Sequence, residues 1–344
     1  MKSLPLLCAV LLLVPGCAGR DYQIPDEGLL SAPLIEESYH VDREWWKLYH
    51  DAELNRMVDM ALARNIDLAR SAISVNRALY QARQLGANLV PSFSASGDAS
   101  SRTDLESGQA SRSFNASFGL AYELDLWGRL RNAASAGAWE YRATEQDRES
   151  TRLALINSVV NTWYSMADTS RSLELARESL NYYERLLAIV QAQYAEGKTD
   201  GLDPAQTEQS LLSQRATVLT LENQFEEEKR TLRDLLNLRP EEKLDFTLPD
   251  LLSVAVPEVD LSVPVAALGL RPDVSAAEYL LLSAFRDQEA AKGDLFPELS
   301  IGGTLGASAA SFSDFFTAPF VSGLFLFPHG RGVAGRCQKH PARR

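Results

Sequence analysis

The segment IDLARSAISVNRALYQARQLGANLVPSFSASG at residues 66–97 recurs as PDVSAAEYLLLSAFRDQEAAKGDLFPELSIGG at residues 272–303. Six residues are identical between the copies, each displaced by 206 positions: Asp67 and Asp273, Ala78 and Ala284, Leu89 and Leu295, Pro91 and Pro297, Ser94 and Ser300, Gly97 and Gly303. The matches mark the same features in both copies, namely a helical stretch, a Leu-x-Pro break and an alternating segment. The sequence therefore predicts a duplicated helix–strand unit.

The composition argues against several classes of function. The chain carries 34 Lys and Arg against 46 Asp and Glu, a formal charge of −12, whereas nucleic-acid binding needs clustered basic side chains. The three cysteines match no metal-ligand spacing. The glycine-rich residues 302–306 are followed by no phosphate-binding lysine. We therefore expect no nucleic-acid partner, no metal or cofactor, and no enzymatic activity.

The N-terminus has the features of a secretion signal. Residues 1–16 contain an apolar run at 4–14 that is too short to span a bilayer. The following Val-Pro-Gly-Cys ends at Cys17 and resembles the lipobox of bacterial lipoproteins, although Pro15 departs from its usual small residue. The resemblance implies a palmitate-bearing lipid anchor at Cys17, and Ala18 fits delivery to the outer membrane. The alternative is an ordinary signal peptide with Cys17 as a bystander.

The next segments are expected to form a linker and helices. Residues 17–41 are rich in Pro and acidic residues, as in an extended linker. Residues 42–90 form the helical part of the first repeat, with Asp42 as a candidate N-cap and Pro91 as the stop. No stretch beyond the signal reaches eighteen apolar residues, so we expect further membrane insertion to use β-strands.

Residues 91–126 predict the first membrane β-hairpin, because residues 113–126 alternate between apolar and polar side chains. The side chains expected to face lipid are Phe114, Phe118, Leu120 and Tyr122. The side chains expected to face a water-filled lumen are Asn115, Ser117, Glu123 and Asp125. A soluble sandwich strand shows the same alternation and is the alternative. Strand length near ten residues and long polar loops favour a membrane strand.

Residues 127–238 predict a long helical hairpin, because apolar residues recur at alternating spacings of three and four. The outgoing seam consists of Leu155, Val159, Thr162, Met166, Leu173, Ala176, Leu180, Tyr183, Leu187, Val190 and Tyr194. A helix from residue 137 to 194 would be roughly 87 Å long. The returning seam consists of Leu211, Val218, Leu221, Phe225, Leu232 and Leu235. The alternative is a helical bundle in which this hairpin is half of the core.

The hairpin tip is predicted at residues 196–204. Gly197 suits a helix C-cap, Asp203 an N-cap, and Pro204 the first position of the returning helix. Beyond the hairpin, residues 239–270 are a Pro-rich linker and residues 271–296 are the helix of the second repeat. A second β-hairpin is expected at residues 297–328, and residues 329–344 form an aberrant basic tail.

Four motifs together resemble the TolC-like outer-membrane efflux lipoproteins, the channels of tripartite pumps. They are EWWKLYHD at residues 44–51, YELDLWGR at 122–129, RPDV at 271–274 and LFP at 295–297. The resemblance implies a mainly α protein with membrane β-strands. Each subunit of a homotrimer would give four strands to a shared twelve-stranded outer-membrane β-barrel and long helices to a periplasmic tube.

The resemblance also implies partners and a task. The subunit would be a passive conduit for drugs or other small solutes, working with a periplasmic adaptor protein and an inner-membrane pump. The tip residues expected to face the adaptor are Gly197, Lys198, Thr199 and Asp203. The competing function is a periplasmic adaptor or a structural coiled-coil lipoprotein. Adaptors have helical hairpins but lack duplicated membrane-type strands.

The C-terminus departs from the family. Members continue past the fourth strand with a second helical hairpin, whereas the pattern here ends after Pro328. The basic tail resembles an out-of-frame reading, so we expect a truncated or frame-shifted chain that is impaired as a channel. A genuine divergent short member is the alternative.

Overall fold

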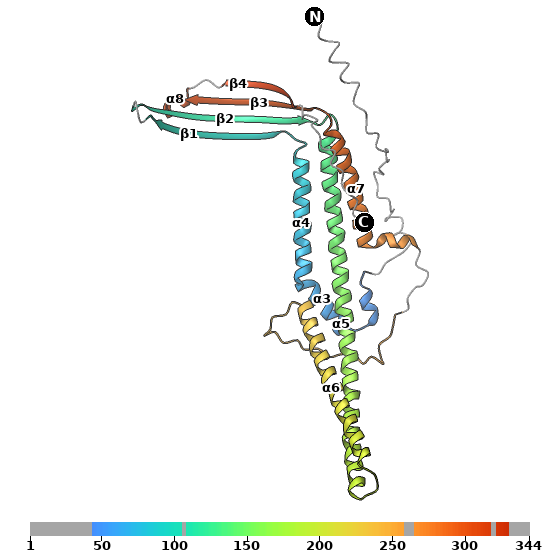
Figure 1. The fold of residues 1–344 in the computed structure, drawn as a ribbon. Helices are drawn as coiled ribbons and strands as arrows, with labels where there is room; N and C mark the ends of the chain where they lie inside the picture. Colours follow the sequence, from blue (N-terminus) through green and yellow to red (C-terminus); the bar gives the residue numbers. More distant parts are fainter. Residues whose placement is uncertain (1–42, 105–107, 258–264, 318–320, 330–344) are drawn as a thin grey trace.

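A computed structural model describes residues 43–104, 108–257, 265–317 and 321–329 of the chain. Figure 1 shows an elongated molecule with a four-stranded sheet at one end, a helical stem in the middle and a helical hairpin at the other end. Within the described residues, no helix combines the length and the apolar character needed to cross a membrane.

The duplication predicted from the sequence is confirmed in the order and length of the elements. Helix α4 (Ile66–Ala87) leads into strand β1 (Ser92–Thr103), and helix α7 (Pro272–Gly293) leads into strand β3 (Glu298–Ala309). The two helices have 22 residues each and the two strands 12 each. Both helices pack against the long helix α5 (Arg129–Ala195), as Figure 1 shows.

Two glycines allow the helices of the stem to approach closely. A Cβ atom at Gly137 of α5 would lie 2.6 Å from Leu85 Cδ1 of α4. A Cβ atom at Gly293 of α7 would lie 2.9 Å from Arg129 Cβ of α5. At Gly293 the neighbouring atoms are the Cβ and the backbone of Arg129, so this packing site depends on glycine. At Gly137 the nearest atom is the end of the flexible Leu85 side chain, which can shift.

The sheet has the order β1-β2-β3-β4, with all neighbours antiparallel. Strand β2 spans Ala110–Leu124 and strand β4 spans Val321–His329. Side chains directly opposite each other lie on the same face of the sheet, so the printed register assigns each residue to a face. Ser117 lies opposite Ser96 and Asn115 opposite Asp98, whereas Phe118 lies opposite Ala95.

The helical hairpin consists of α5 and α6 (Leu202–Leu235). Helix α5 has 67 residues, which corresponds to about 100 Å of length. The predicted seam between the two helices is confirmed over its central part, where Leu173, Ala176 and Val218 are buried and pack with Leu180 and Leu221. Tyr194 departs from the prediction. It is 52% exposed, because its ring lies over Gly201 in the tip, where α6 has not yet begun.

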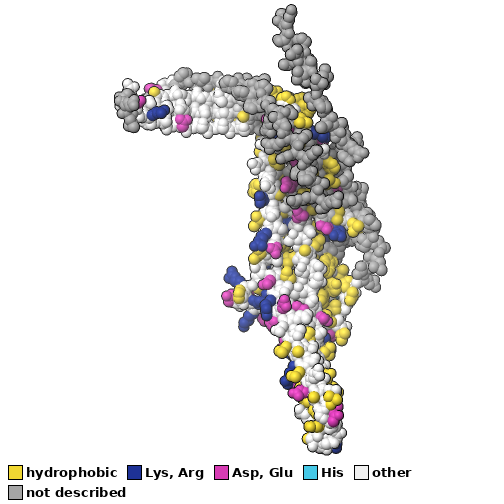
Figure 2. Space-filling view, in the orientation of Figure 1, with side chains coloured by type: hydrophobic (Ala, Val, Ile, Leu, Met, Phe, Trp, Pro, Cys, Tyr) yellow, Lys and Arg dark blue, Asp and Glu magenta, His cyan; other side chains and the backbone are white. Residues whose placement is uncertain are grey.

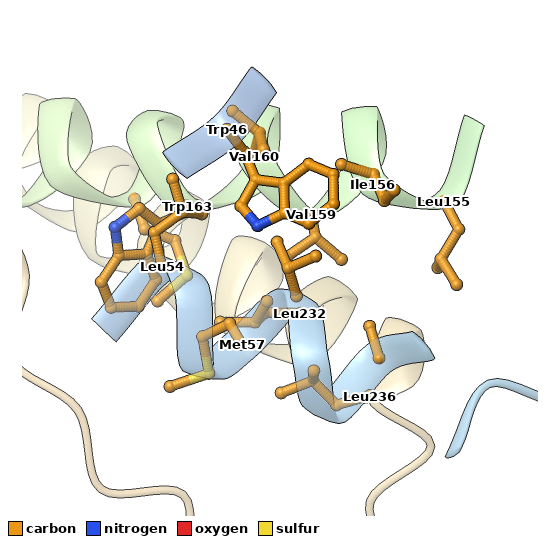
Figure 3. Close-up of a cluster of buried hydrophobic side chains, with 13 residues drawn as sticks. Trp46, Leu54, Met57, Leu155, Ile156, Val159, Val160, Trp163, Leu232 and Leu236 are labelled. Carbon is orange, nitrogen blue, oxygen red and sulfur yellow. The ribbon is translucent and has the colours of Figure 1, made fainter. Parts of the chain in front are cut away.

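The main hydrophobic core lies where the hairpin joins the stem (Figure 3). The 3₁₀-helix η1 (Trp45–Tyr49) and helix α3 (Ala52–Arg64) pack there on the middle of α5 and the end of α6. Its largest fully buried side chains include Trp46, Trp163, Met57, Met166 and Leu232. The expected N-cap Asp42 lies outside the described residues, and Asp51 caps α3 instead, accepting the Leu54 N–H at 3.0 Å.

The segment after α6 contacts α6 and the main core. Arg233 of α6 holds the first residues of this segment in place. Its guanidinium donates to the backbone carbonyl oxygens of Glu242 at 2.9 Å and Arg239 at 2.7 Å. Phe246 and its apolar neighbours pack on the main core. A 3₁₀-helix, η2 (Val265–Leu270), precedes α7, and a short helix, α8 (Phe312–Phe315), follows β3.

Candidate functional site

One face of the sheet is built from small polar side chains. Ser96 Oγ and Ser117 Oγ lie 2.8 Å apart, Ser100 Oγ and Ser113 Oγ lie 2.9 Å apart, and Asn115 Nδ2 donates to Asp98 Oδ2 at 2.9 Å. The next strand continues this face with Gly302, Thr304 and Gly306. Such a face offers water many donors and acceptors and few bulky obstructions.

The opposite face is apolar. The rings of Phe93 and Phe118 stack with centroids 6.0 Å apart, and Phe114 meets Phe312 edge-to-face at 5.8 Å. Leu120 and Tyr122 lie on this face by register, opposite Gly303 and Ile301 of β3. Phe93 is 67% exposed and Phe118 is 48% exposed. The two faces therefore differ as the alternation predicted, and their contact with lipid or lumen stays a prediction.

Asp125 is not part of the polar strand face. Strand β2 ends at Leu124, and the Asp125 carboxylate accepts the N–H groups of Leu130 and Arg131, each at 3.0 Å. These orphan N–H groups at the start of α5 need an acceptor, and Asp125 supplies it. With this acceptor in place, α5 begins at Arg129, at the start of the hairpin predicted for residues 127–238. Burial raises the pKa of Asp125, but the bonds from Arg131 and Leu130 lower it more, leaving it below the ordinary value.

At the tip of the hairpin, Gly197 ends helix α5, as its predicted role at the helix C-terminus requires. Its φ of 71° lies in the left-handed region. The Gly197 N–H donates to Tyr194 O and the Lys198 N–H donates to Gln193 O, both at 2.9 Å. This pair of bonds satisfies the last carbonyls of α5 in the Schellman arrangement. The Lys198 ammonium pairs with the Glu196 carboxylate, and both side chains are exposed.

The predicted start of the returning helix, at Pro204, was wrong by two residues. Helix α6 begins at Leu202, so Asp203 and Pro204 lie inside its first turn and Asp203 is not the N-cap. The Asp200 carboxylate accepts the Leu202 N–H at 2.9 Å, so the helix starts before Asp203. Pro204 fits there because N–H groups of the first turn have no partner within the helix.

A third notable region is the junction where strands leave the stem, which the sequence did not reveal as a site. Trp127 Nε1 donates to Pro297 O at 3.0 Å, and its ring stacks on Phe296 at 4.6 Å between centroids. Arg129 forms ion pairs with Glu123, Asp294 and Glu298. Two of the motifs quoted above, YELDLWGR and LFP, thus meet in space, which links the end of the first repeat to the turn of the second.

The described residues contain no group of three or more His, Cys, Asp or Glu side chains arranged to hold a metal ion. Open recesses lie along the hairpin of α5 and α6. One, lined by Tyr164, Asp168, Thr169 and Glu228 among others, measures about 400 Å³. Burial, with the nearby charge of Asp51, raises the pKa of Tyr164 to about 12, so this phenol is neutral at physiological pH.

Comparisons with known proteins agree on one family. The model of the outer membrane efflux protein family matches residues 57–238. The toxin and drug export protein A of Aggregatibacter actinomycetemcomitans is 40% identical over 311 residues, which cover 90% of this chain and 68% of that protein. The pyoverdine export outer membrane protein OpmQ of Pseudomonas putida is 30% identical over 322 residues, covering 90% and 68% of the two chains.

The fold is shared with solved structures. One of them is the crystal structure of CusC, which was studied for its folding and transmembrane channel formation. This chain superposes on CusC with a TM-score of 0.72 at 22% sequence identity. The match covers 92% of this chain and 74% of CusC. At this identity, the comparison establishes the arrangement of helices and strands.

Proposed function

Because the chain belongs to the outer membrane efflux protein family, we propose that it is the outer-membrane channel component of a tripartite efflux pump. It acts as a passive conduit and carries out no chemistry on its cargo. The observation that carries this proposal is the sheet, whose hydroxyl-lined face and aromatic face continue directly into a stem and hairpin of great length.

The conduit forms by assembly of three copies. Among the described strands, β1 pairs only with β2 and β4 pairs only with β3, so the sheet has two open edges. Four strands cannot close a barrel, whereas three copies provide enough strands for a closed wall. In this assembly the polar face with Asn115 and Ser117 lines the lumen, and the face with Phe114, Phe118, Leu120 and Tyr122 meets lipid.

The helical hairpin supports the same assembly. A second apolar stripe with heptad spacing runs along α5 outside the seam, and its members are the exposed side chains Leu175, Tyr182 and Ile189. Helix α6 also exposes Leu212 and Leu219, one heptad apart. Such stripes in water are unfavourable and are typical of helices that pack against further helices. We assign them to the wall of a periplasmic tube.

The remaining partners follow from the same proposal. The tip, in which Gly197, Lys198 and Asp203 are exposed and Thr199 is half-buried, faces a periplasmic adaptor protein that connects to an inner-membrane pump. Cys17, which lies outside the described residues, carries the lipid anchor. Two relatives are named for export, one of toxin and drug and one of pyoverdine, so we extend the export of drugs or other small solutes to this chain.

Planar bilayer recording tests the conduit directly. The purified chain is added to a bilayer, and a chimera carrying the C-terminal part of the Aggregatibacter relative is recorded alongside it. Discrete conductance steps from the chain or from the chimera would support the proposal. Absence of steps from both proteins, at demonstrated insertion, would overturn the proposal.

A further inference from the structure

A single arginine connects the elements that meet at the junction. Arg129 is the first residue of α5. Its Nη2 lies 2.5 Å from Oε1 of Glu123, at the end of β2, and 3.4 Å from Oε1 of Glu298, the first residue of β3. Its Nε lies 3.8 Å from Oδ1 of Asp294, which follows α7. One guanidinium thus contacts both strands and the helix of the second repeat.

The contacts are partly shielded from water. The side chains of Arg129, Glu123 and Glu298 are 22%, 30% and 20% exposed. Helix α7 reaches this position because Gly293 lies directly against Arg129. Burial lowers the pKa of Arg129, but the surrounding carboxylates, Glu123 foremost, raise it above its ordinary value. The guanidinium therefore stays charged. Its short, partly shielded pair with Glu123 is stronger than a pair on an open surface, whereas Asp294 is 48% exposed.

The duplication indicates that the carboxylates are placed for Arg129. Positions 293, 294 and 298 of the second repeat are Gly, Asp and Glu, and the matching positions of the first repeat are Ala87, Asn88 and Ser92. Both turns have the same length and both contain Leu-x-Pro. The turn therefore forms without acidic side chains, and the acids occur only in the copy that contacts Arg129.

From these contacts we infer that Arg129 is a positioning residue, which fixes the direction in which the sheet leaves the stem. A guanidinium is suited to this task because its donors diverge in one plane and engage several carboxylates together, whereas an ammonium is a point charge. The consequence for transport rests on the proposed channel function. In a conduit, the junction sets how the polar sheet face continues into the helical tube.

The test measures the geometry of the junction in the full chain, without transport. Spin labels are placed at Ser100 on β1 and Ser158 on α5, both exposed, after replacement of the three native cysteines by serine. Pulsed electron resonance in detergent micelles then gives the distribution of distances between sheet and stem. R129Q should broaden this distribution about twofold or more, because three carboxylates lose their common partner. R129K should restore part of the original width.

The matched control is R131Q. Arg131 lies two residues away, and among the described residues its ion pair is with Asp125 of its own repeat, at 3.0 Å. The distribution should therefore stay narrow. A role in stability alone would lower the thermal midpoint of R129Q without changing the native distance. An unchanged distribution in R129Q overturns the inference. If R129Q loses helical circular dichroism, an unchanged distribution in E123Q/E298Q overturns it equally. Lack of conductance with a junction that broadens as expected would instead count against the channel function alone.

Discussion

The Asp51 side chain forms hydrogen bonds with two helices of the core, α3 and α5. Its Oδ1 accepts the Leu54 N–H at the start of α3, and its Oδ2 accepts Trp163 Nε1 of α5 at 2.8 Å. Trp163 is fully buried. The carboxylate therefore satisfies a helix terminus and an indole N–H that has no access to water.

Replacement of Asp51 should destabilise the stem strongly. Asp51→Ala removes a helix cap and leaves a buried donor unpaired, so we expect a loss of about 2–4 kcal/mol in the free energy of unfolding. Urea denaturation followed by tryptophan fluorescence measures this loss. Asp59→Ala, at an exposed position of the same helix, should stay within about 0.5 kcal/mol. Equal effects of the two substitutions would show that the bonds of Asp51 are unimportant.

Asp125 predicts a pH dependence of stability. Because the folded state holds the pKa of this carboxyl below its ordinary value, its contribution is present above the ordinary aspartate pKa of about 3.9. The contribution is lost as the pH falls through the lower pKa of the folded state. Asp125→Asn should therefore flatten the decline of the thermal midpoint between neutral and acid pH. A decline as steep as that of the unmodified chain would contradict this assignment.

At the scale of elements, periodicity predicted what is local and repeated. The α4–β1 and α7–β3 units and the Leu173–Val218 region of the seam follow from patterns that recur every two, three or four residues. The caps were less predictable, because Asp125 accepts N–H groups five and six residues further along the chain, and Asp200 rather than Asp203 accepts an N–H at the start of α6. The Arg129 ion pairs could not be predicted, since Glu298 lies far away in sequence and becomes a neighbour only through the fold.

Two leucines of α5 separate the packing of the hairpin from its assembly. Leu173 is buried in the seam with α6, whereas Leu175 is 49% exposed on the outer stripe. Leu173→Ala should cost about 2–4 kcal/mol in the isolated subunit, because it leaves a cavity. Leu175→Ala should change the stability of the isolated subunit by less than about 0.5 kcal/mol.

In the assembled protein, Leu175→Ala should have the larger effect on oligomer formation, although Leu173→Ala has the larger effect on the stability of the isolated subunit. Leu175→Ala should shift the distribution of oligomers toward single subunits, as measured by analytical ultracentrifugation in detergent. Leu173→Ala should act on subunit folding first. If Leu175→Ala leaves the oligomer distribution unchanged, the outer stripe is not an assembly surface.

At the scale of the whole molecule, the proposed channel requires the two faces of the sheet to meet two different media. Single cysteines at Asn115 and Ser117 should react with a polar thiol reagent in reconstituted vesicles, and those at Phe118 and Leu120 should be protected. Arg in place of Leu120 should cost about 2–4 kcal/mol if the position lies near the middle of the bilayer. Reactivity that lacks an every-second-residue rhythm would refute a membrane strand.

The length of the molecule also assigns its polarity. The sheet and the hairpin tip lie at opposite ends (Figure 1), and the sheet end displays few charged side chains while the stem carries many (Figure 2). If the sheet is in the membrane, the tip is the part farthest from it. A helix of 67 residues then places the tip on the order of 100 Å away from the sheet, where a second periplasmic protein can reach it.

Crosslinking tests this polarity. A photoreactive side chain at Lys198 or Thr199, both in the turn that the Gly197 cap holds in place, should capture an adaptor protein in cells that express the pump. The matched control is the same side chain at Ser101 or Arg112. These two residues pair with each other near the turn between β1 and β2. Capture from the tip alone fits an adaptor-facing end, because the proposal places that end in the periplasm. Capture from the sheet end alone would reverse the assigned direction of the molecule.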